Sequence, residues 1–199
     1  MPLVGILLAA GRGKRFDPSG VQNKLLQALP NGDAVVLASA RNLLAALPRV
    51  VAVVRPGDER VAALLGAAGC EVRVCAEADT GMAASLTHAL DYARGAPGWL
   101  VALGDMPFVR PATMRLLAER IEGGARIAAP LYRGRRGNPV AFCGDYLSLL
   151  LALDGDQGAR AILHSHTVSE VEVDDAGVLR DIDLPNDLKK GQTLGSDPE

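Results

Sequence analysis

The sequence predicts an α/β fold: a doubly wound, mostly parallel sheet with an antiparallel edge, in three αβα layers. Apolar runs of strand length alternate with helix-length segments as far as residue 131, a rhythm that joins parallel strands through right-handed crossovers. Most of these runs are apolar throughout, as in strands buried on both faces. The 199 residues, 49% of them hydrophobic, are expected to form one domain over residues 1–188 with a core that needs no disulfides. The polar residues 189–199 are expected to form a frayed tail.

Each element of the first 131 residues has a local signal. Continuous apolar runs predict buried strands, and one alternating run predicts a half-exposed edge strand. Proline and glycine mark helix ends: Pro48 follows the first helix, Gly69 stops the second, and Pro111 opens the fourth. Asp58 is expected to cap the start of the second helix. The strands expected are 3–9, 50–54, 71–75 (the edge strand), 99–103 and 126–131, and the helices are 33–47, 58–68, 82–94 and 111–122.

The pattern changes after residue 132. A basic turn over 133–137 separates the strand 126–131 from a strand at 138–142, which is expected to run antiparallel to a neighbour. Two helical pieces and an alternating strand are expected after it, at 146–153, 157–165 and 168–173. This part of the chain therefore supplies the predicted antiparallel edge.

Charge and composition argue against several kinds of partner. Lys and Arg number 21 and Asp and Glu number 23, for a net charge of −2, whereas a nucleic-acid binder is typically basic. The N-terminus lacks the positive region of a signal peptide, and no apolar run reaches membrane-spanning length. We expect no nucleic-acid partner, no membrane partner and a cytoplasmic location. Cys70, Cys75 and Cys143 form no CxxC pair and are expected to be small buried thiols.

The loop after the first strand predicts a polyphosphate cradle. Its small residues let a ligand approach the backbone, its N–H groups can surround an anion, and its lysines and arginines add positive charge. The Walker and dinucleotide fingerprints are both absent, and the alternative is a flexible turn with solvated charges. The residues expected to contact a nucleotide here are Leu8, Ala9, Ala10, Gly11, Gly13, Arg15 and Lys24.

Asp105 follows the strand 99–103 and is predicted to be a metal ligand, while the preceding Gly104 is expected to contact the nucleotide. A carboxylate that faces a triphosphate is repelled unless a cation lies between them, and Mg²⁺ binds one or two carboxylates plus phosphate oxygens. The alternative role of Asp105, capping the next helix, is disfavoured because prolines intervene. Asp183 is the candidate second carboxylate, and a solvated turn is its alternative.

The segment 79–86 offers a glycine turn and a helix N-terminus with free N–H donors. From these residues alone a simple capped helix is the plain interpretation, and contact of Thr80, Gly81 and Ser85 with the nucleotide is implied by the family resemblance described next.

Several ordered motifs together resemble a known family, the MobA-like nucleotidyltransferases, and within it the molybdenum cofactor cytidylyltransferases. The first is LAAGRGKRF followed by NKLL, at 8–16 and 23–26. LGDMP at 103–107, GNPV at 137–140 and GDQGAR at 155–160 follow in the family's order. DIDLPNDL at 181–188 resembles the family's DIDTPEDL, with Leu184 and Asn186 as departures. The resemblance implies a Rossmann-like fold, a Mg²⁺ cofactor and transfer of a nucleotidyl group with loss of pyrophosphate.

The resemblance also implies substrates and residue roles. GMxxSL at 81–86 looks like the base-facing loop of cytidylyl-transferring members, which implies CTP, and the acceptor implied is molybdopterin, with a molybdoenzyme or its chaperone as a possible partner. Asn138, Asp156 and Arg160 are the implied acceptor-binding residues.

The reaction expected is an in-line attack by a terminal phosphate of the acceptor on the α-phosphorus of the nucleotide. That phosphate is already anionic near neutral pH, so the barrier is mostly charge repulsion. Arg15, Lys24 and Asp105 are the expected catalytic residues, with Mg²⁺ on Asp105 and Asp183. The alternatives are a GTP donor, a different phosphorylated acceptor, or a binding module that holds the cofactor without turnover.

Overall fold

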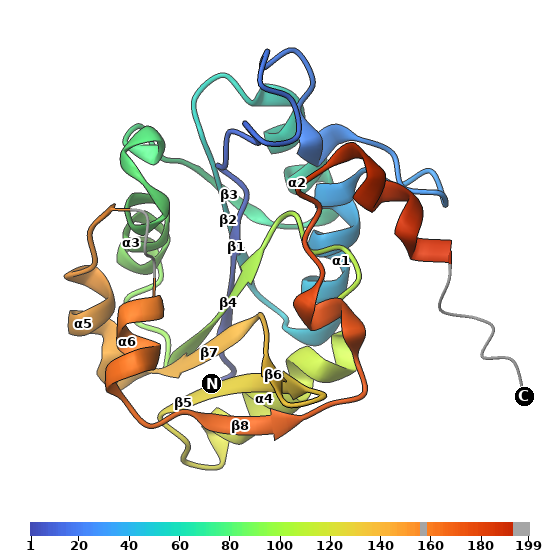
Figure 1. Ribbon diagram of the computed structural model, residues 1–199. Helices are drawn as coiled ribbons and strands as arrows, with labels where there is room; N and C mark the ends of the chain where they lie inside the picture. The colour runs from blue at the N-terminus through green and yellow to red at the C-terminus, as the bar shows by residue number, and fades with distance from the viewer. Residues whose placement is uncertain (156–158, 193–199) are drawn as a thin grey trace, which may run out of the picture.

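The computed structural model describes residues 1–155 and 159–192, which form three layers (Figure 1). A central sheet separates two apolar clusters. One cluster joins it to the first helix layer and the other to the second. The first layer holds α1 (Val35–Ala46), α2 (Glu59–Ala68) and α4 (Pro111–Glu122), and the second holds α3 (Met82–Tyr92), α5 (Leu147–Leu151) and α6 (Arg160–Ser165). The predicted α/β fold class is confirmed.

The sheet has eight strands within the described residues, in the order β3-β2-β1-β4-β7-β5-β6, with β8 paired to β5. Neighbours among β3, β2, β1 and β4 are parallel, as are β5 and β8, whereas β7 is antiparallel to β4 and β5, and β6 to β5. The antiparallel strand β7 thus lies inside the sheet, and the short β6 provides the antiparallel edge. The strands are β1 (Val4–Leu8), β2 (Val50–Val54), β3 (Glu71–Val74), β4 (Gly98–Leu103), β5 (Ile127–Tyr132), β6 (Arg135–Arg136), β7 (Val140–Cys143) and β8 (Ser169–Glu172).

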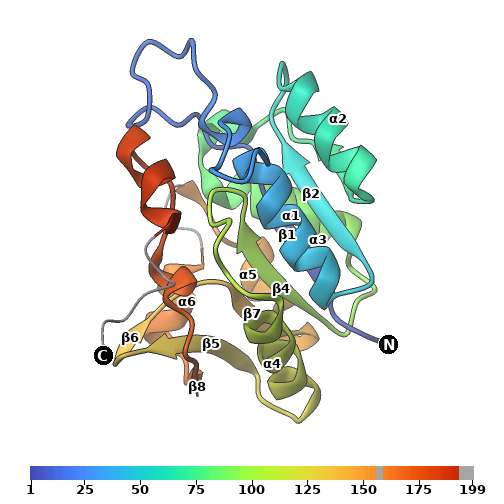
Figure 2. The same cartoon turned by 90° about the vertical axis from the view of Figure 1, so that its right-hand side faces the viewer.

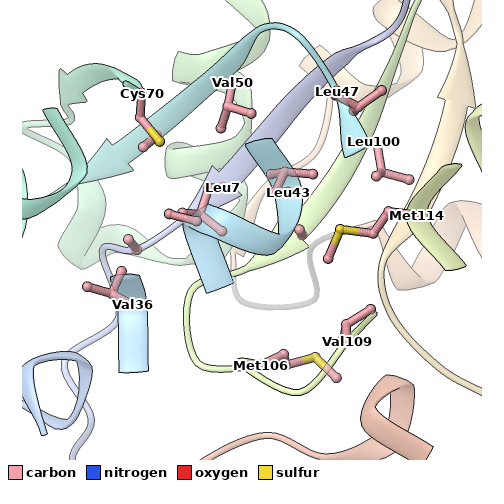
Figure 3. Packing of buried hydrophobic residues seen from close by; sticks show 14 of the residues in the cluster. Leu7, Val36, Leu43, Leu47, Val50, Cys70, Leu100, Met106, Val109 and Met114 are labelled. Atoms are coloured by element: carbon pink, nitrogen blue, oxygen red, sulfur yellow. The ribbon is translucent and has the colours of Figure 1, made fainter. Parts of the chain in front are cut away.

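The central strand β1 shows why continuous apolar runs form this sheet. Successive side chains of a strand point to opposite faces, so Leu7 joins the cluster under α1 while Ile6 joins the cluster under α3. Figure 3 shows Leu7 and Leu43 with Leu100 in the first cluster. Gly5 leaves room for α1, because a Cβ there would lie 3.1 Å from the Leu43 side chain. Both faces of β1 are therefore buried, as its continuous apolar sequence predicts.

The second helix ends as predicted but begins differently. Gly69 adopts the left-handed conformation (φ 103°) that terminates α2. Asp58 precedes the helix, yet its side chain makes no capping hydrogen bond. It accepts instead from Asn23 Nδ2 and Arg55 Nε, both at 3.2 Å. The capping prediction for Asp58 is wrong, because these side-chain donors hold the carboxylate.

Five short 3₁₀ segments complete the described chain, and the last lies beside the loop that follows β1 (Figures 1 and 2). This last segment runs to Gln192, inside the stretch expected as a frayed tail, and residues 193–199 lie outside the described part. The structure has α6 beginning at Arg160 within the helix expected over 157–165, and residues 156–158, including Asp156, lie outside the described part. The segments are η1 (Lys24–Leu26), η2 (Ala78–Thr80), η3 (Gly144–Tyr146), η5 (Ala176–Leu179) and η6 (Pro185–Gln192).

Across the described part of the chain, no helix combines the length and apolarity needed to cross a bilayer. The cysteines are free thiols; Cys70 and Cys75 are buried and Cys143 is half-buried. Burial raises the pKa of Cys70 to about 11 and also raises that of Cys75, so both thiols stay protonated at neutral pH.

Candidate active site

A cavity of about 430 Å³ opens at the carboxyl ends of β1 and β4, where ligands bind in open α/β sheets. It gathers residues from the loop after β1, from the start of α3 and from the end of β4. Eight of the predicted site residues line it: Leu8, Ala9, Ala10, Gly11, Lys24, Gly81, Ser85 and Asp105. The remaining lining residues are Arg12, Lys14, Leu25, Ala78, Asp79, Met82 and Leu103.

The loop after β1 is shaped by one glycine and one aspartate. Gly13 has φ 61°, and its carbonyl accepts the N–H groups of Phe16 and Asp17. The Asp17 carboxylate accepts from the Ser19 hydroxyl at 2.6 Å and from the Gln22 N–H at 2.7 Å, and these bonds lower its pKa. Lysine 24 packs where Gly13 has no side chain, since a Cβ there would lie 3.2 Å from the lysine Cγ. The glycine therefore makes space for the aliphatic stem of Lys24.

Lys24 lies between two carboxylates. Its Nζ is 2.6 Å from Asp105 Oδ2 and 3.4 Å from Asp183 Oδ1. The Lys24 side chain is only 9% exposed, and the side chains of Asp105 and Asp183 are 21% and 30% exposed. Arg15 pairs with the other oxygen of Asp183 and is itself mostly exposed. We call Lys24, Asp105 and Asp183 the inner cluster; it unites three predicted residues from widely separated parts of the chain.

Three hydrogen bonds, two from main-chain N–H groups and one from a side-chain hydroxyl, fix the backbone around Asp105. The Gly104 N–H donates to Leu8 O at 2.9 Å, and the Ser39 hydroxyl of α1 lies 3.0 Å from Gly104 O as its donor. The Ile182 N–H donates to Asp105 O at 2.9 Å, which also ties the Asp183 segment to this loop. Asp105 Oδ1 is buried and makes no hydrogen bond with any residue of the described part of the chain. An orphaned carboxylate oxygen beside a cavity is unusual, because buried polar atoms are normally paired.

Asp183 is positioned by the start of η6. Asp187 Oδ2 accepts the N–H groups of Asp183 at 3.2 Å and Leu184 at 2.8 Å. Leu184 has no hydroxyl with which to cap η6, but the carboxylate of Asp187 takes its N–H, as the third helical residue does in a capping box. The departure from the family motif at Leu184 is therefore compatible with an ordered segment.

The cavity also carries an ion pair at its opening. Arg12 donates to both oxygens of Asp79, with Nε 2.6 Å from Oδ1, and the two side chains are 48% and 53% exposed. The hydrogen bonds from Arg12 lower the pKa of Asp79, and Asp79 raises that of Arg12. We call this the outer pair; it joins the loop after β1 to the segment before α3.

Other predicted residues lie off the cavity lining. The Thr80 hydroxyl donates to Glu77 O at 2.8 Å, and Thr80 lines a separate open hollow beside α3. Asn138 lines a very small cavity with Leu103 and Met106, and its N–H donates to Val178 O. Arg160 is exposed at the start of α6 and is not part of the lining. The structure thus does not bring Asn138 and Arg160 to the cavity, and Asp156 lies outside the described residues.

Several residues of the site were not predicted from the sequence. Arg12 was counted only as a nearby cation, and its partner Asp79 only as part of a loop. Ser39 lies inside a helix and carries no local signal of a bond to Gly104, 65 residues away. Asp187 could have been recognised from its place three residues after Leu184, at the start of a helix that opens with Pro185.

The inner cluster suits a hard divalent cation. Mg²⁺ takes oxygen ligands and is typically held by one or two carboxylates plus substrate phosphates. Asp105 and Asp183 both face the Lys24 ammonium, and Asp105 Oδ1 is an acceptor that receives no hydrogen bond from the described residues. Within residues 1–155 and 159–192, no group of three His, Cys, Asp or Glu side chains is placed to hold a metal alone. The donor set therefore fits a metal that arrives with phosphate oxygens.

Comparison with known proteins connects this geometry to a family. Residues 5–171 match the family model described as the MobA-like NTP transferase domain. The bifunctional protein GlmU of Novosphingobium aromaticivorans is 31% identical over 173 residues. That match covers 80% of this chain but only 36% of GlmU, so the chain spans about a third of the length of this curated relative.

Solved structures share the whole fold. Rv0371c from Mycobacterium tuberculosis H37Rv is 29% identical, with a TM-score of 0.83 and 96% of each chain covered. A structure of Rv0371c in complex with manganese is 27% identical, with a TM-score of 0.77, and covers 96% of this chain and 97% of that one. A nucleotidyl transferase from Methanothermobacter is 26% identical, with a TM-score of 0.80 and 95% of each chain covered.

Proposed function

This chain belongs to the MobA-like NTP transferase family, and we propose that it transfers CMP from CTP to the terminal phosphate of a molybdopterin-type acceptor, with release of pyrophosphate. The family and the similar structures support the nucleotidyltransferase class. The observation that carries the proposal is the inner cluster: Lys24 and Asp105 line the cavity beside the glycine-containing loop, and Lys24 also contacts the second carboxylate, Asp183.

The chemistry asks mainly for positioning and for cations. A phosphomonoester is largely dianionic at neutral pH, so the acceptor needs no strong base to become a nucleophile. Its approach to a triphosphate is opposed by charge, and fixed cations lower that barrier. Lys14 and Lys24 line the cavity and Arg15 lies beside it on Asp183, so the loop after β1 can neutralise the β- and γ-phosphates.

A divalent metal would be held by Asp105 and Asp183, and when bound it would shield the phosphate charges during transfer. The orphaned Oδ1 of Asp105 supports this assignment. Mg²⁺ is our choice of ion because the donors are carboxylate oxygens.

The donor assignment is supported by the segment before α3. The GMxxSL residues Gly81, Met82 and Ser85 all line the cavity, where they can meet a base. The small residues Gly81 and Ser85 leave space for a base, and the first N–H groups of α3 are donors that it can use. The segment also resembles that of cytidylyl-transferring members of the family.

The acceptor assignment depends on the sequence motifs. A second candidate is transfer to another phosphorylated small molecule, and it is favoured by the separation of Asn138 and Arg160 from the cavity. Both candidates use the same donor site and the same chemistry. They differ only in what enters as nucleophile.

A pyrophosphate-release assay tests the proposal. The protein is incubated with Mg²⁺ and each of the four NTPs, with molybdopterin, with a sugar phosphate or with no acceptor. Release only with CTP and molybdopterin is expected. Preference for GTP or ATP would overturn the donor assignment, and turnover only with another phosphate would replace the acceptor. Tight nucleotide binding without release under any condition would favour a binding module.

A further inference from the structure

Lys24 is not placed as a residue that only binds the triphosphate of the nucleotide would be. A lysine on the triphosphate must turn its ammonium toward the phosphates, yet the ammonium here lies 2.6 Å from Asp105 and 3.4 Å from Asp183. These two carboxylates are the proposed metal ligands. The lysine thus neutralises the same two oxygens that a divalent cation would need.

From this geometry we infer that Lys24 makes the site select a metal–triphosphate complex over the bare cation, because its ammonium holds the carboxylate pair until a triphosphate draws it away. The inference rests on the proposed function and deepens it. Two carboxylates that share one partner repel each other once that partner leaves, so a cation must replace the ammonium. In the absence of a triphosphate, the Lys24 ammonium is most stable on the two carboxylates.

The surroundings of Lys24 favour this exchange. Its side chain is only 9% exposed, so little water competes with its ammonium for the carboxylates. Its stem crosses Gly13, where no Cβ restricts it, and it lines the cavity that would hold the phosphates. A change of its terminal rotamers alone can therefore carry the charge from the carboxylates to the cavity.

Asp183 also keeps a second cation during the exchange. Arg15 contacts Asp183 Oδ2, while Lys24 contacts Oδ1. Asp105 has no comparable substitute: its Oδ2 accepts from Lys24 and its Oδ1 is unpaired. The departure of Lys24 therefore exposes Asp105 most, and the cation that replaces it is expected to depend on Asp105.

Binding of Mn²⁺ to the nucleotide-free full-length protein tests the inference, with free Mn²⁺ measured by electron paramagnetic resonance. Wild-type protein is expected to bind Mn²⁺ weakly. Lys24→Met keeps most of the stem but removes the charge, and is expected to bind Mn²⁺ about tenfold or more tightly. An α,β-methylene CTP analogue is expected to tighten Mn²⁺ binding in the wild type and to do so far less in Lys24→Met.

Two controls locate the effect. Arg120→Met removes an equal charge from an exposed residue in the last turn of α4, outside the cavity lining, and is expected to leave Mn²⁺ affinity within twofold of wild type. The double variant Lys24→Met with Asp105→Asn is expected to lose the gained affinity. A gain that survives Asp105→Asn, or an equal gain in Arg120→Met, would overturn the inference.

The result is separable from the proposed function. Equal Mn²⁺ affinity of wild type and Lys24→Met would overturn the inference even if pyrophosphate is released from CTP. Conversely, tighter Mn²⁺ binding by Lys24→Met that depends on Asp105 would support the exchange at the carboxylates even if CTP proved not to be the donor, and only the proposed donor would then fall.

Discussion

The inner cluster and the outer pair both place opposite charges in contact at one cavity, which Lys24, Asp105 and the outer pair line, but they differ in how firmly they are held. The inner cluster is mostly buried and its backbone is tied to β1, α1 and the segment before η6. The outer pair is about half exposed and joins two loops only through its own side chains. Buried charges in a fixed frame can set the geometry of a reaction, whereas exposed pairs exchange readily with water. We therefore expect the inner cluster to carry the chemistry of the proposed reaction and the outer pair to affect nucleotide binding.

The largest effect is expected at the centre of the inner cluster. Asp105→Asn keeps the shape of the side chain but removes the charge that faces Lys24, and should lower metal-dependent pyrophosphate release by about a thousandfold. Steady-state kinetics at saturating Mg²⁺ measure this loss. Asp91→Asn, which removes an exposed carboxylate on α3, is the control and should retain full turnover. Turnover of Asp105→Asn near that of wild type would remove this residue from the chemistry.

A smaller effect is expected from the frame behind the inner cluster. Ser39→Ala removes the buried hydroxyl that holds Gly104 O, and should lower the free energy of unfolding by about 1–3 kcal/mol. Because the next residue is Asp105, kcat should fall about tenfold while KM for the nucleotide changes little. Urea unfolding and kinetics measure the two effects. Ser148→Ala, at an exposed serine of α5, should change neither; equal kcat in both variants would show that the Ser39 bond is only structural.

At the outer pair, Arg12→Ala should act on binding alone. The side chain is exposed, so its loss should leave the unfolding temperature nearly unchanged. KM for the nucleotide should rise about threefold, because one cation of the cavity is lost, while kcat stays near wild type. Arg41→Ala, which breaks an exposed pair away from the cavity, should leave KM unchanged. If kcat of Arg12→Ala fell as much as that of Ser39→Ala, the outer pair would contribute to the chemistry as the inner cluster does, and the proposed difference between them would be wrong.

The smallest expected effect is a change in the pKa of Asp79. Hydrogen bonds from Arg12 hold the pKa of Asp79 below its ordinary value. A lowered pKa means that this carboxylate favours the folded state above the pKa of the unfolded chain, and that the contribution is lost as pH falls through the folded-state pKa. In Arg12→Ala the pKa of Asp79 should therefore rise toward its ordinary value. Carbon-13 NMR of the side-chain carboxyl measures it; identical values with and without Arg12 would show that the pair does not persist in solution.

Local signals account for most of the fold. β1, β2 and β4 are continuous apolar runs, and Gly69 ends α2 with the positive φ that glycine permits. The antiparallel position of β7 was expected, but its place between β4 and β5 was not, because strand order depends on pairing between distant segments. Asp58 shows a similar limit. Its capping signal is local, but the donors on Asn23 and Arg55 that take its carboxylate are set by the folded chain.

The candidate site divides in the same way. The glycines and cations of 8–24 and the aspartate after β4 indicate a phosphate and metal site from their place after strands. Gly11, Lys24 and Asp105 do line one cavity, whereas Gly13 and Arg15 are not part of its lining. The partner of each charge was not predictable. Lys24 contacts Asp105 and Asp183 across 81 and 159 residues, and no local pattern records such a contact. The direction of Thr80 was also missed, since its hydroxyl bonds back to Glu77 rather than into the cavity.

The attachment of the segment 182–187 to Asp105 has a consequence for how the protein is made. Ribosomes synthesise a chain from its N-terminus, so the sheet positions up to β8 emerge before Asp183 does. A nascent chain can therefore assemble the glycine-lined loop and Asp105 while the inner cluster still lacks its second carboxylate. Competence for the proposed nucleotidyl transfer would then arise only once Asp183 has emerged, after the strands of the sheet.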